Sequence, residues 1–308
     1  MKNYTFIDYA TQAYIAVVAL LILCFHNGSV SGWPWLLGAN AAWMVLVHLL
    51  VQAYARHPSS RLLNFFRHFY PVILYTPFYV ETGLLNRMFF KDYLDPTIAQ
   101  WEQQLWGCQP SVLFMHKLPW LALSEVLYAA YFSYYAIIVG IGIALFVRSR
   151  QQFFHYVSVV SFVFYVCYLI YIVLPVIGTP VFFHDAGGYE LPPAIQQLAV
   201  TDTYPASVQS GIFFRLMSWL YRVFEPPGAA FPSSHVVVTL CTLYFSFRYL
   251  RPIRYVHLVI AVLLCLATVY CRYHFVVDVL AGMVTAAVLV PTGNWLYFKY
   301  QQRDLGKS

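Results

Sequence analysis

The first candidate for a chemical role in this sequence is a histidine at the start of an apolar run. The stretch Pro232-Ser-Ser-His235 leads directly into Val-Val-Val-Thr-Leu240. Pro232 disfavours helix in the residue before it, and Ser233 or Ser234 is a good N-cap for a helix that starts here. Backbone N–H groups at a helix start bind anions, phosphate in particular. His235 is therefore expected beside an anion site.

A second histidine lies in the stretch from Tyr270 to Gly282. His274 and Asp278 are four residues apart, so on a helix they share one face and can hydrogen-bond. The carboxylate would fix the ring tautomer and leave the other ring nitrogen unprotonated and free to act as a nucleophile. Arg272, two residues before His274, would add a positive charge at the same place.

Together these residues predict a site for attack on phosphorus. His274 would displace the leaving alcohol and form a phosphohistidine, with Asp278 orienting its ring. His235 would protonate that alcohol and then deprotonate the incoming water or hydroxyl. The non-bridging oxygens would be held by Arg272 and by the backbone of Ser233 and Ser234.

A metal centre is the alternative interpretation, because two histidines and a carboxylate can hold iron or zinc. Arg272 and the helix N-terminus would both repel a cation, so we expect no metal and no cofactor. Glu81 and Glu125 lie in apolar segments, where either a hydrogen bond to a neighbour or the ion path of a transporter would account for them. Packed, non-catalytic roles are expected for His48, His155 and His257.

The elements that must position this site are membrane helices. Of the 308 residues, 61% are hydrophobic and only 10% are charged, and the mean hydropathy of +0.63 excludes a soluble globule. The net charge of +6 is scattered along the chain, so no nucleic-acid surface is predicted. The six cysteines lack metal-ligand spacing and are interpreted as packing residues. The predicted fold class is an all-α, polytopic membrane helix bundle.

About eight segments are predicted to span the bilayer, each near the length that a hydrocarbon layer of ~30 Å requires. They cover residues 11–26, 34–54, 70–85, 119–147, 154–177, 234–250, 255–271 and 274–298. With the N-terminus inside, 12 of the 18 Lys and Arg residues fall on the cytoplasmic side, as the positive-inside rule expects. This topology leaves two long outer connections and places the predicted site on the non-cytoplasmic face.

Both outer connections are expected to contain helices that lie along the membrane interface. Residues 86–118 carry Leu94, Ile98, Trp101 and Leu105 at helical spacing, with Asp95 and Glu102 between them. Residues 178–233 carry Arg215 and Arg222, which are seven residues apart and therefore on one helix face.

Two of these motifs resemble a known family. Pro232-Ser-Ser-His235 and His274-x-x-x-Asp278 are similar to the second and third signatures of the type 2 phosphatidic acid phosphatase superfamily. The form Arg272-Tyr-His-Phe-Val-Val-Asp278 is most similar to its inositol phosphorylceramide synthase-like branch. The resemblance implies a six-helix catalytic core, with extra N-terminal helices here, and phosphatase or phosphotransferase activity on lipid phosphate esters.

The sequence departs from the superfamily pattern at two places. Ala267 and Thr268 stand where the third signature commonly has Ser-Arg, and Thr179-Pro180 stands where the first signature ends in a cation followed by Arg-Pro. Arg215 or Arg222 could supply the missing charge. A phosphodiester carries one negative charge, whereas a monoester carries close to two. Fewer cations therefore favour a diester donor and headgroup transfer between lipids.

The expected function is transfer of a phospho-headgroup from a membrane phospholipid to a lipid alcohol. The alternatives are hydrolysis of a phosphatidic acid-like or isoprenoid phosphate monoester with water as acceptor, and, outside enzymes, lipid or ion transport. The expected division of the chain is N-terminal membrane helices and an outer interfacial segment over 1–118, a catalytic membrane core over 119–300 and a cytoplasmic tail over 301–308.

Overall fold

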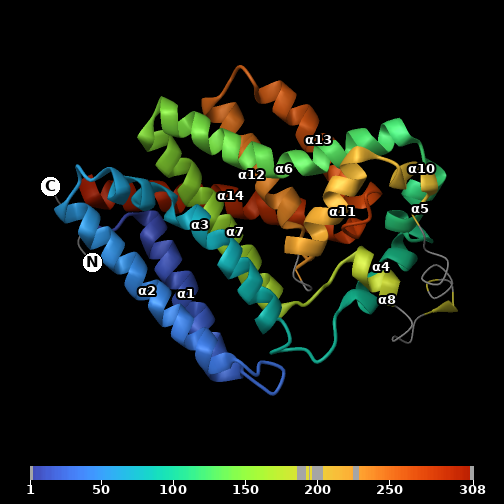
Figure 1. Ribbon diagram of the computed structural model, residues 1–308, viewed down its shortest axis with the longest axis horizontal. Helices are drawn as coiled ribbons and strands as arrows, with labels where there is room; N and C mark the ends of the chain where they lie inside the picture. The colour runs from blue at the N-terminus through green and yellow to red at the C-terminus, as the bar shows by residue number, and fades with distance from the viewer. Residues whose placement is uncertain (1–2, 186–191, 194, 196–203, 225–228, 306–308) are drawn as a thin grey trace. The chain divides into compact units, whose positions relative to one another are not determined.

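The regular structure of the protein is helical. The computed structural model describes residues 3–185, 192–193, 195, 204–224 and 229–305, and within these ranges it contains helices and one isolated bridge, between Val176 and Ala229, but no strand (Figure 1). The helices are α1 (Phe6–Phe25), α2 (Trp33–Arg56), α3 (Arg61–Leu85), α4 (Asp95–Trp106), α5 (Pro110–Lys117), α6 (Leu121–Arg148), α7 (Arg150–Val173), α8 (Thr179–Asp185), α10 (Ala206–Gln209), α11 (Ile212–Phe224), α12 (Ser234–Tyr249), α13 (Arg254–Tyr270) and α14 (Val276–Leu305). The predicted all-α fold is confirmed.

Five of the described helices are long and apolar enough to cross a membrane, namely α1, α2, α6, α7 and α14. The other three predicted spans are also helices. Of these, α12 has 16 residues and α13 has 17, fewer than the ~20 that a perpendicular span needs. The third, α3, has 25 residues but contains Arg61, Arg67 and two prolines. Length and composition thus support five of the eight predicted spans.

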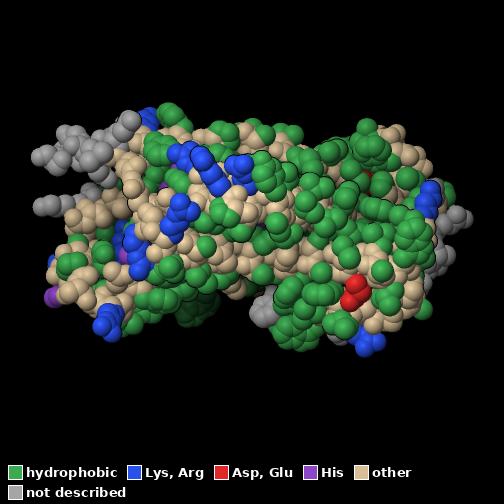
Figure 2. Space-filling model, turned by 90° about the horizontal axis from the view of Figure 1, so that it is seen from above, with side chains coloured by type: hydrophobic (Ala, Val, Ile, Leu, Met, Phe, Trp, Pro, Cys, Tyr) green, Lys and Arg blue, Asp and Glu red, His purple; other side chains and the backbone are tan. Residues whose placement is uncertain are grey.

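Many apolar side chains of the helices are exposed, as expected for a surface that faces a lipid bilayer. Figure 2 shows hydrophobic side chains spread widely over the visible face. Leu20, Val256 and Val284 are each more than half exposed, although each lies within a helix of high hydropathy. Such residues would be costly to leave in water, and a hydrocarbon environment removes that cost.

Contacts divide the chain into two compact units, each built from several segments. The first comprises Met1–Lys91, Gly142–Val173 and Ala287–Ser308, and the second comprises Asp92–Ile141 and Leu174–Ala286. The division predicted at residue 118 from the topology is a different kind of boundary and stays a prediction. All the predicted site residues belong to the second unit.

The first unit is held together by α1, α2, α3 and α7. α1 packs against α2 and α7, and α3 packs against the same two helices. The sequence places Arg67 in an inner connection, but the structure places it inside α3, where it is buried and pairs with the carboxylate of Asp8 at 2.7 Å. Tyr70 donates a second hydrogen bond to Asp8. A buried carboxylate on α1 therefore explains why this arginine lies within a helix.

The isolated histidines and Glu81 have the structural partners that packed residues need. Nδ1 of His48 contacts the hydroxyl of Tyr4 at 2.9 Å, and Nε2 of His155 contacts Oδ1 of Asn294 at 2.8 Å. Glu81 accepts a hydrogen bond of 2.5 Å from Asn40. In the second unit, Nδ1 of His257 contacts the hydroxyl of Ser246 at 2.7 Å. These contacts match the packed roles expected for the histidines.

The second unit contains residues 92–118 of the first predicted outer connection and the whole of the second. α13 packs against α12 and α5. Helices are present in both connections, as α4 and α11, and their location at the membrane interface stays a prediction. Glu125 of α6 accepts hydrogen bonds from the backbone N–H groups of Ile212, at 2.9 Å, and Phe213, at 3.1 Å. Glu125 thus caps the N-terminus of α11, which is the favourable end of a helix for a carboxylate.

Candidate active site

The two histidines singled out in the sequence lie next to each other. Ser233 is the N-cap of α12 and accepts a hydrogen bond from the N–H of Val236, so His235 lies in the first turn of that helix. His274 directly precedes the capped start of α14. The ring centroids of His235 and His274 are 5.7 Å apart, with an angle of 60° between the ring planes. Both histidines are buried.

Asp278 contacts His274 as predicted, but not on a shared helix face, because α14 begins at Val276 and His274 lies before it. Its Oδ2 lies 3.3 Å from Nδ1 of His274 and also accepts the backbone N–H of Phe275 at 2.9 Å. The same carboxylate therefore caps α14 and orients the ring. Nε2 of His274 is buried and makes no hydrogen bond. With Nδ1 engaged by the carboxylate, Nε2 is the ring nitrogen left to react.

Close contact between α12 and α14 fixes the separation of the two rings. The N–H of Ser233 donates to the carbonyl oxygen of Asp278 at 3.1 Å. A Cβ atom on Gly282 would lie 3.0 Å from the Ser233 carbonyl oxygen and 3.1 Å from Cβ of Val236. Only a glycine lets the two helix backbones approach this closely without a shift of one of them.

Arg272 adopts a backbone conformation that L-residues rarely take. Its φ of 61° is left-handed, and it follows Cys271, the C-cap of α13. The N–H groups of Tyr273 and His274 both donate to the carbonyl oxygen of Thr268 at 3.0 Å. Glycine usually occupies such a position, and a non-glycine residue costs on the order of 1–3 kcal/mol there. Strain of this kind is a reason to look for function at Arg272.

The guanidinium group of Arg272 is buried among aromatic and backbone groups. Its central carbon lies 4.9 Å from the ring centroid of Tyr204, and one terminal nitrogen donates to the carbonyl oxygen of Val112 at 3.4 Å. Arg272 is the only buried Lys or Arg in the described part of this unit. It is therefore the one buried cation that these residues can offer to a phosphate near His274.

The segment that departs from the first superfamily signature also adjoins the site. Gly178 has a φ of +87°, and a Cβ atom there would lie 3.1 Å from the carbonyl oxygen of Tyr273. The hydroxyl of Thr179 donates to the carbonyl oxygen of Arg272 at 2.5 Å. This segment thus supports the backbone of the strained arginine, and Thr179 contributes a hydroxyl where the superfamily places a cation.

Asp95 and Glu102 were not predicted as site residues. The sequence places them between the apolar residues of an expected interfacial helix, but both are fully buried in α4, whereas Trp101 is 50% exposed and Leu105 is 66% exposed. Oε1 of Glu102 accepts the N–H of Val277 at 2.9 Å, in the first turn of α14. Their spacing of seven residues, which puts both carboxylates on one face of a helix, is the signal that could have revealed them.

Asp95 holds the segment that contacts Arg272. Its two carboxylate oxygens accept the N–H groups of Ile177 and Gly178, each at 2.8 Å. Burial raises the pKa of Asp95 to about 7, with the negative charge of Asp278 as a smaller cause in the same direction. Burial likewise raises the pKa of Glu102 to about 7, again with a smaller contribution from Asp278. Helix α4 therefore positions both the segment at Gly178 and the start of α14, through carboxyl groups whose pKa values are near 7.

These raised pKa values predict that the folded protein loses stability as the pH rises toward 8. The unfolded pKa of Glu is about 4, so the stability contributed by the neutral carboxyl is complete below that pH and is lost as the pH rises through about 7. Thermal unfolding in detergent between about pH 5 and 8 should show this fall, and Glu102→Gln should reduce it. Asp92→Asn, which changes an exposed carboxylate, is the control. Parallel pH curves for wild type and Glu102→Gln would contradict the assignment.

Arg215, one suggested source of the missing cation, lies on α11. Arg215 is exposed on α11, and its Nε donates to the carbonyl oxygen of Gln209 at 3.4 Å. The side chain of Arg222 lies outside the described residues. The hydrogen bond to Gln209 joins the guanidinium of Arg215 to the last residue of α10, and the suggestion that Arg215 supplies the missing cation stays a prediction.

Tyrosine rings pack against His235, and the sequence was too rich in tyrosine for these particular residues to be recognised. The ring of His235 stacks on Tyr131 at a centroid distance of 4.8 Å and lies 4.4 Å from the ring centroid of Tyr134. Tyr221 of α11 stacks on Tyr273 at 3.9 Å, and its hydroxyl contacts that of Tyr131 at 2.7 Å. Aromatic contacts on this scale restrict the ring of His235 and exclude water from one side of it.

Fold and site together define a polytopic, helical membrane protein with a buried histidine pair, one histidine backed by a carboxylate. The sequence profile of the PAP2 superfamily matches residues 96–292, which is more than half of the chain and includes both histidines. The chain belongs to the PAP2 superfamily, whose members are typically phosphatases or phosphotransferases. No curated protein and no solved structure gave a significant match.

Proposed function

We propose that the protein is a membrane lipid phosphotransferase that moves a phospho-headgroup from a phospholipid to a lipid alcohol, as the inositol phosphorylceramide synthase-like branch would. The observation that carries the proposal is the buried His274–Asp278 pair facing His235 in a PAP2 chain. The acceptor would be ceramide-like or diacylglycerol-like. The reaction proposed below uses protein side chains for each chemical step and requires no metal or other cofactor.

In the first step, Nε2 of His274 attacks the phosphorus atom of the donor. The bond between phosphorus and the leaving oxygen breaks, and protonated His235 gives its proton to that oxygen. The result is a phosphohistidine, a free lipid alcohol and a neutral His235. Asp278 stabilises the positive charge that develops on the ring of His274, since its Oδ2 already lies beside Nδ1.

In the second step, neutral His235 takes the proton of the acceptor hydroxyl while the acceptor oxygen attacks phosphorus. The bond between phosphorus and Nε2 breaks, so both histidines return to their starting states. Arg272 and the backbone N–H of Ser234 would bind the non-bridging oxygens throughout, whereas the N–H of Ser233 already donates to the carbonyl oxygen of Asp278. Arg272 is buried and two residues from His274, which supports its role.

The charge of the site favours a diester donor. One buried cation matches the single negative charge of a phosphodiester better than the near-double charge of a monoester. Thr179, a neutral residue, stands where the superfamily has a cation, and the guanidinium of Arg215 donates to the carbonyl oxygen of Gln209. Hydrolysis of a monoester is the second candidate, because the same two histidines could activate water in place of the acceptor.

The site is proposed to open on the non-cytoplasmic face. Most of the Lys and Arg residues belong to the connections on the opposite side of the predicted topology, and the positive-inside rule makes that side cytoplasmic. The donor and acceptor would then both be lipids of the outer leaflet.

A headgroup-transfer assay separates the candidates. Purified protein in mixed micelles with a chelator is given labelled phosphatidylinositol or labelled phosphatidic acid, each with and without ceramide or diacylglycerol. We expect label to reach the lipid alcohol from the diester, and only when acceptor is added. Free phosphate from phosphatidic acid without acceptor would instead make the protein a phosphatase. If neither product forms and a vesicle flux assay is positive, transport replaces both.

A further inference from the structure

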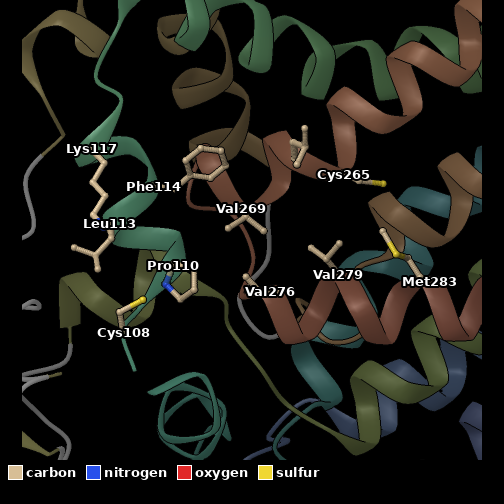
Figure 3. Close-up of a pocket in the computed structure, with 11 residues that line it drawn as sticks. Cys108, Pro110, Leu113, Phe114, Lys117, Cys265, Val269, Val276, Val279 and Met283 are labelled. Atoms are coloured by element: carbon tan, nitrogen blue, oxygen red, sulfur yellow. The ribbon is translucent and has the colours of Figure 1, made fainter. Parts of the chain in front are cut away.

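A separate apolar cavity of about 420 Å³ lies in the second unit, between α5, α13 and α14 (Figure 3). Val269 of α13 and Val276 and Val279 of α14 line its inner wall, and Leu113 of α5 lines the opposite side. Its volume is within the range of ~300–1,000 Å³ that small-molecule sites occupy. The proposed reaction makes no use of this cavity.

One charge stands at the rim of this cavity, and the rest of its lining is apolar or sulfur-containing. Lys117, the last residue of α5, is exposed. Figure 3 shows it at the end of the cavity remote from Met283 and Cys265. A ligand that matches this lining has a long apolar part and one anionic group at its end.

The long direction of the cavity runs along the axis of α14, as the acyl chain of a membrane lipid would. From Val276 to Met283 it follows seven residues of α14, which corresponds to ~10 Å along the axis of a candidate span. At the other end, the neighbouring helix α4 exposes Trp101 and Trp106, residues that favour the membrane interface. Lys117 would therefore lie at headgroup level and Met283 in the hydrocarbon.

The apolar end is open to the side. Met283 is 40% exposed and Leu266 is 47% exposed, whereas Val269 and Val279 behind them are buried. A hydrocarbon chain could enter over these two exposed residues directly from the bilayer. The cavity is therefore a cleft with buried valines inside, and the exposed side chains of Leu266 and Met283 form its lip, which is an entrance from the membrane.

A layer of packed side chains separates the cavity from the histidines. Val236, the residue after His235, packs with Val269 and Val279 in one buried cluster. The carbonyl oxygen of Val112, next to Leu113, accepts the hydrogen bond from Arg272. A molecule in the cavity would therefore contact α5, α13 and α14 on the side away from the histidines, and it would not reach His274.

We propose that this cavity binds a non-reacting anionic phospholipid of the surrounding membrane. One acyl chain lies along Val276, Val279 and Met283, and Lys117 binds the phosphate. The lipid holds α5 against α13 and α14, and so supports the position of Arg272 from behind. This binding site is distinct from the proposed active site and does not depend on the proposed reaction.

The test is photo-crosslinking with phosphatidylglycerol that carries a diazirine in one acyl chain, compared with phosphatidylcholine of the same chains. In wild type we expect crosslinks in residues 108–117 and 265–283, with about fivefold preference for the anionic lipid, the ratio that one Lys near a lipid surface supplies. Lys117→Gln should remove this preference and Lys117→Arg should keep it. His274→Ala should label as wild type does.

Variants that fill the cavity complete the test. Leu113→Trp and, at the exposed lip, Met283→Trp should each reduce labelling at least about fivefold. Leu280→Trp is the matched control, because Leu280 is exposed on α14 but does not line the cavity. Labelling spread evenly over α13 and α14, and unchanged in both filling variants, would overturn the site. Loss of the headgroup from the crosslinked lipid in wild type would show a substrate and overturn its non-reacting role.

Discussion

Replacing His274 with alanine is expected to abolish headgroup transfer, with a fall in kcat of roughly 10⁴-fold or more, because the nucleophile is removed. Alanine removes the ring partner of Asp278, but Oδ2 of that carboxylate still accepts the N–H of Phe275, so the start of α14 stays capped. Binding of the donor should change little. The measurement is the rate of transfer from labelled phosphatidylinositol to ceramide in mixed micelles, together with retention of labelled donor.

His257→Gln is the matched control for this variant. His257 is a buried histidine of the same unit, and glutamine can preserve its hydrogen bond to Ser246. Its transfer rate should stay within about threefold of wild type. A phosphohistidine trapped by rapid acid-free denaturation should appear on the peptide with residue 274 in wild type. Equal transfer by wild type and His274→Ala would exclude the proposed nucleophile.

Replacing Asp278 with asparagine is expected to reduce kcat by roughly 10²–10⁴-fold without a comparable change in KM. Asparagine has nearly the same shape and can still accept the N–H of Phe275, so the start of α14 should remain capped. Its side-chain oxygen would also still accept from Nδ1 of His274, because Oδ2 of Asp278 makes both contacts. Asparagine removes the negative charge that stabilises the ring of His274 as the ring becomes positive during attack on phosphorus.

The comparison that isolates this effect is with Glu102→Gln. Glu102 also accepts a backbone N–H at the start of α14 but does not contact His274. We expect Glu102→Gln to lower kcat far less than Asp278→Asn at about pH 6, where both carboxyls of α4 are largely neutral. If the two variants lose activity equally, Asp278 acts only by holding the helix, and the proposed role of its charge beside His274 is wrong.

Much of the candidate site could be predicted because its parts are local in sequence. Four residues of separation keep His274 within reach of Asp278 at the start of α14, and a serine before His235 gives a helix cap wherever that helix packs. The helices themselves follow from long apolar segments, and five of them meet the length and composition of a span. Such features depend on neighbours within one or two turns.

The environment of the site was less predictable because packing decides it. Asp95 and Glu102 fit an interfacial helix equally well with their carboxylates in water or in the protein. Only the backbone N–H groups of Ile177, Gly178 and Val277, brought from distant segments, make the buried orientation favourable. For the same reason, the exposed side chain of Arg215 could be placed only once its helix was seen in the folded chain.

By itself the sequence determined that this protein is a helical membrane protein with a histidine four residues before a carboxylate, since composition and short spacings act within single segments. Only the tertiary structure decided that the ring of His235 lies beside that of His274. It also decided that α4 binds both the segment at Gly178, which contacts Arg272, and the start of α14. Contacts between residues far apart in sequence depend on how whole helices pack. That packing is set by shape and by the pairing of buried polar groups, as the close approach at Gly282 illustrates.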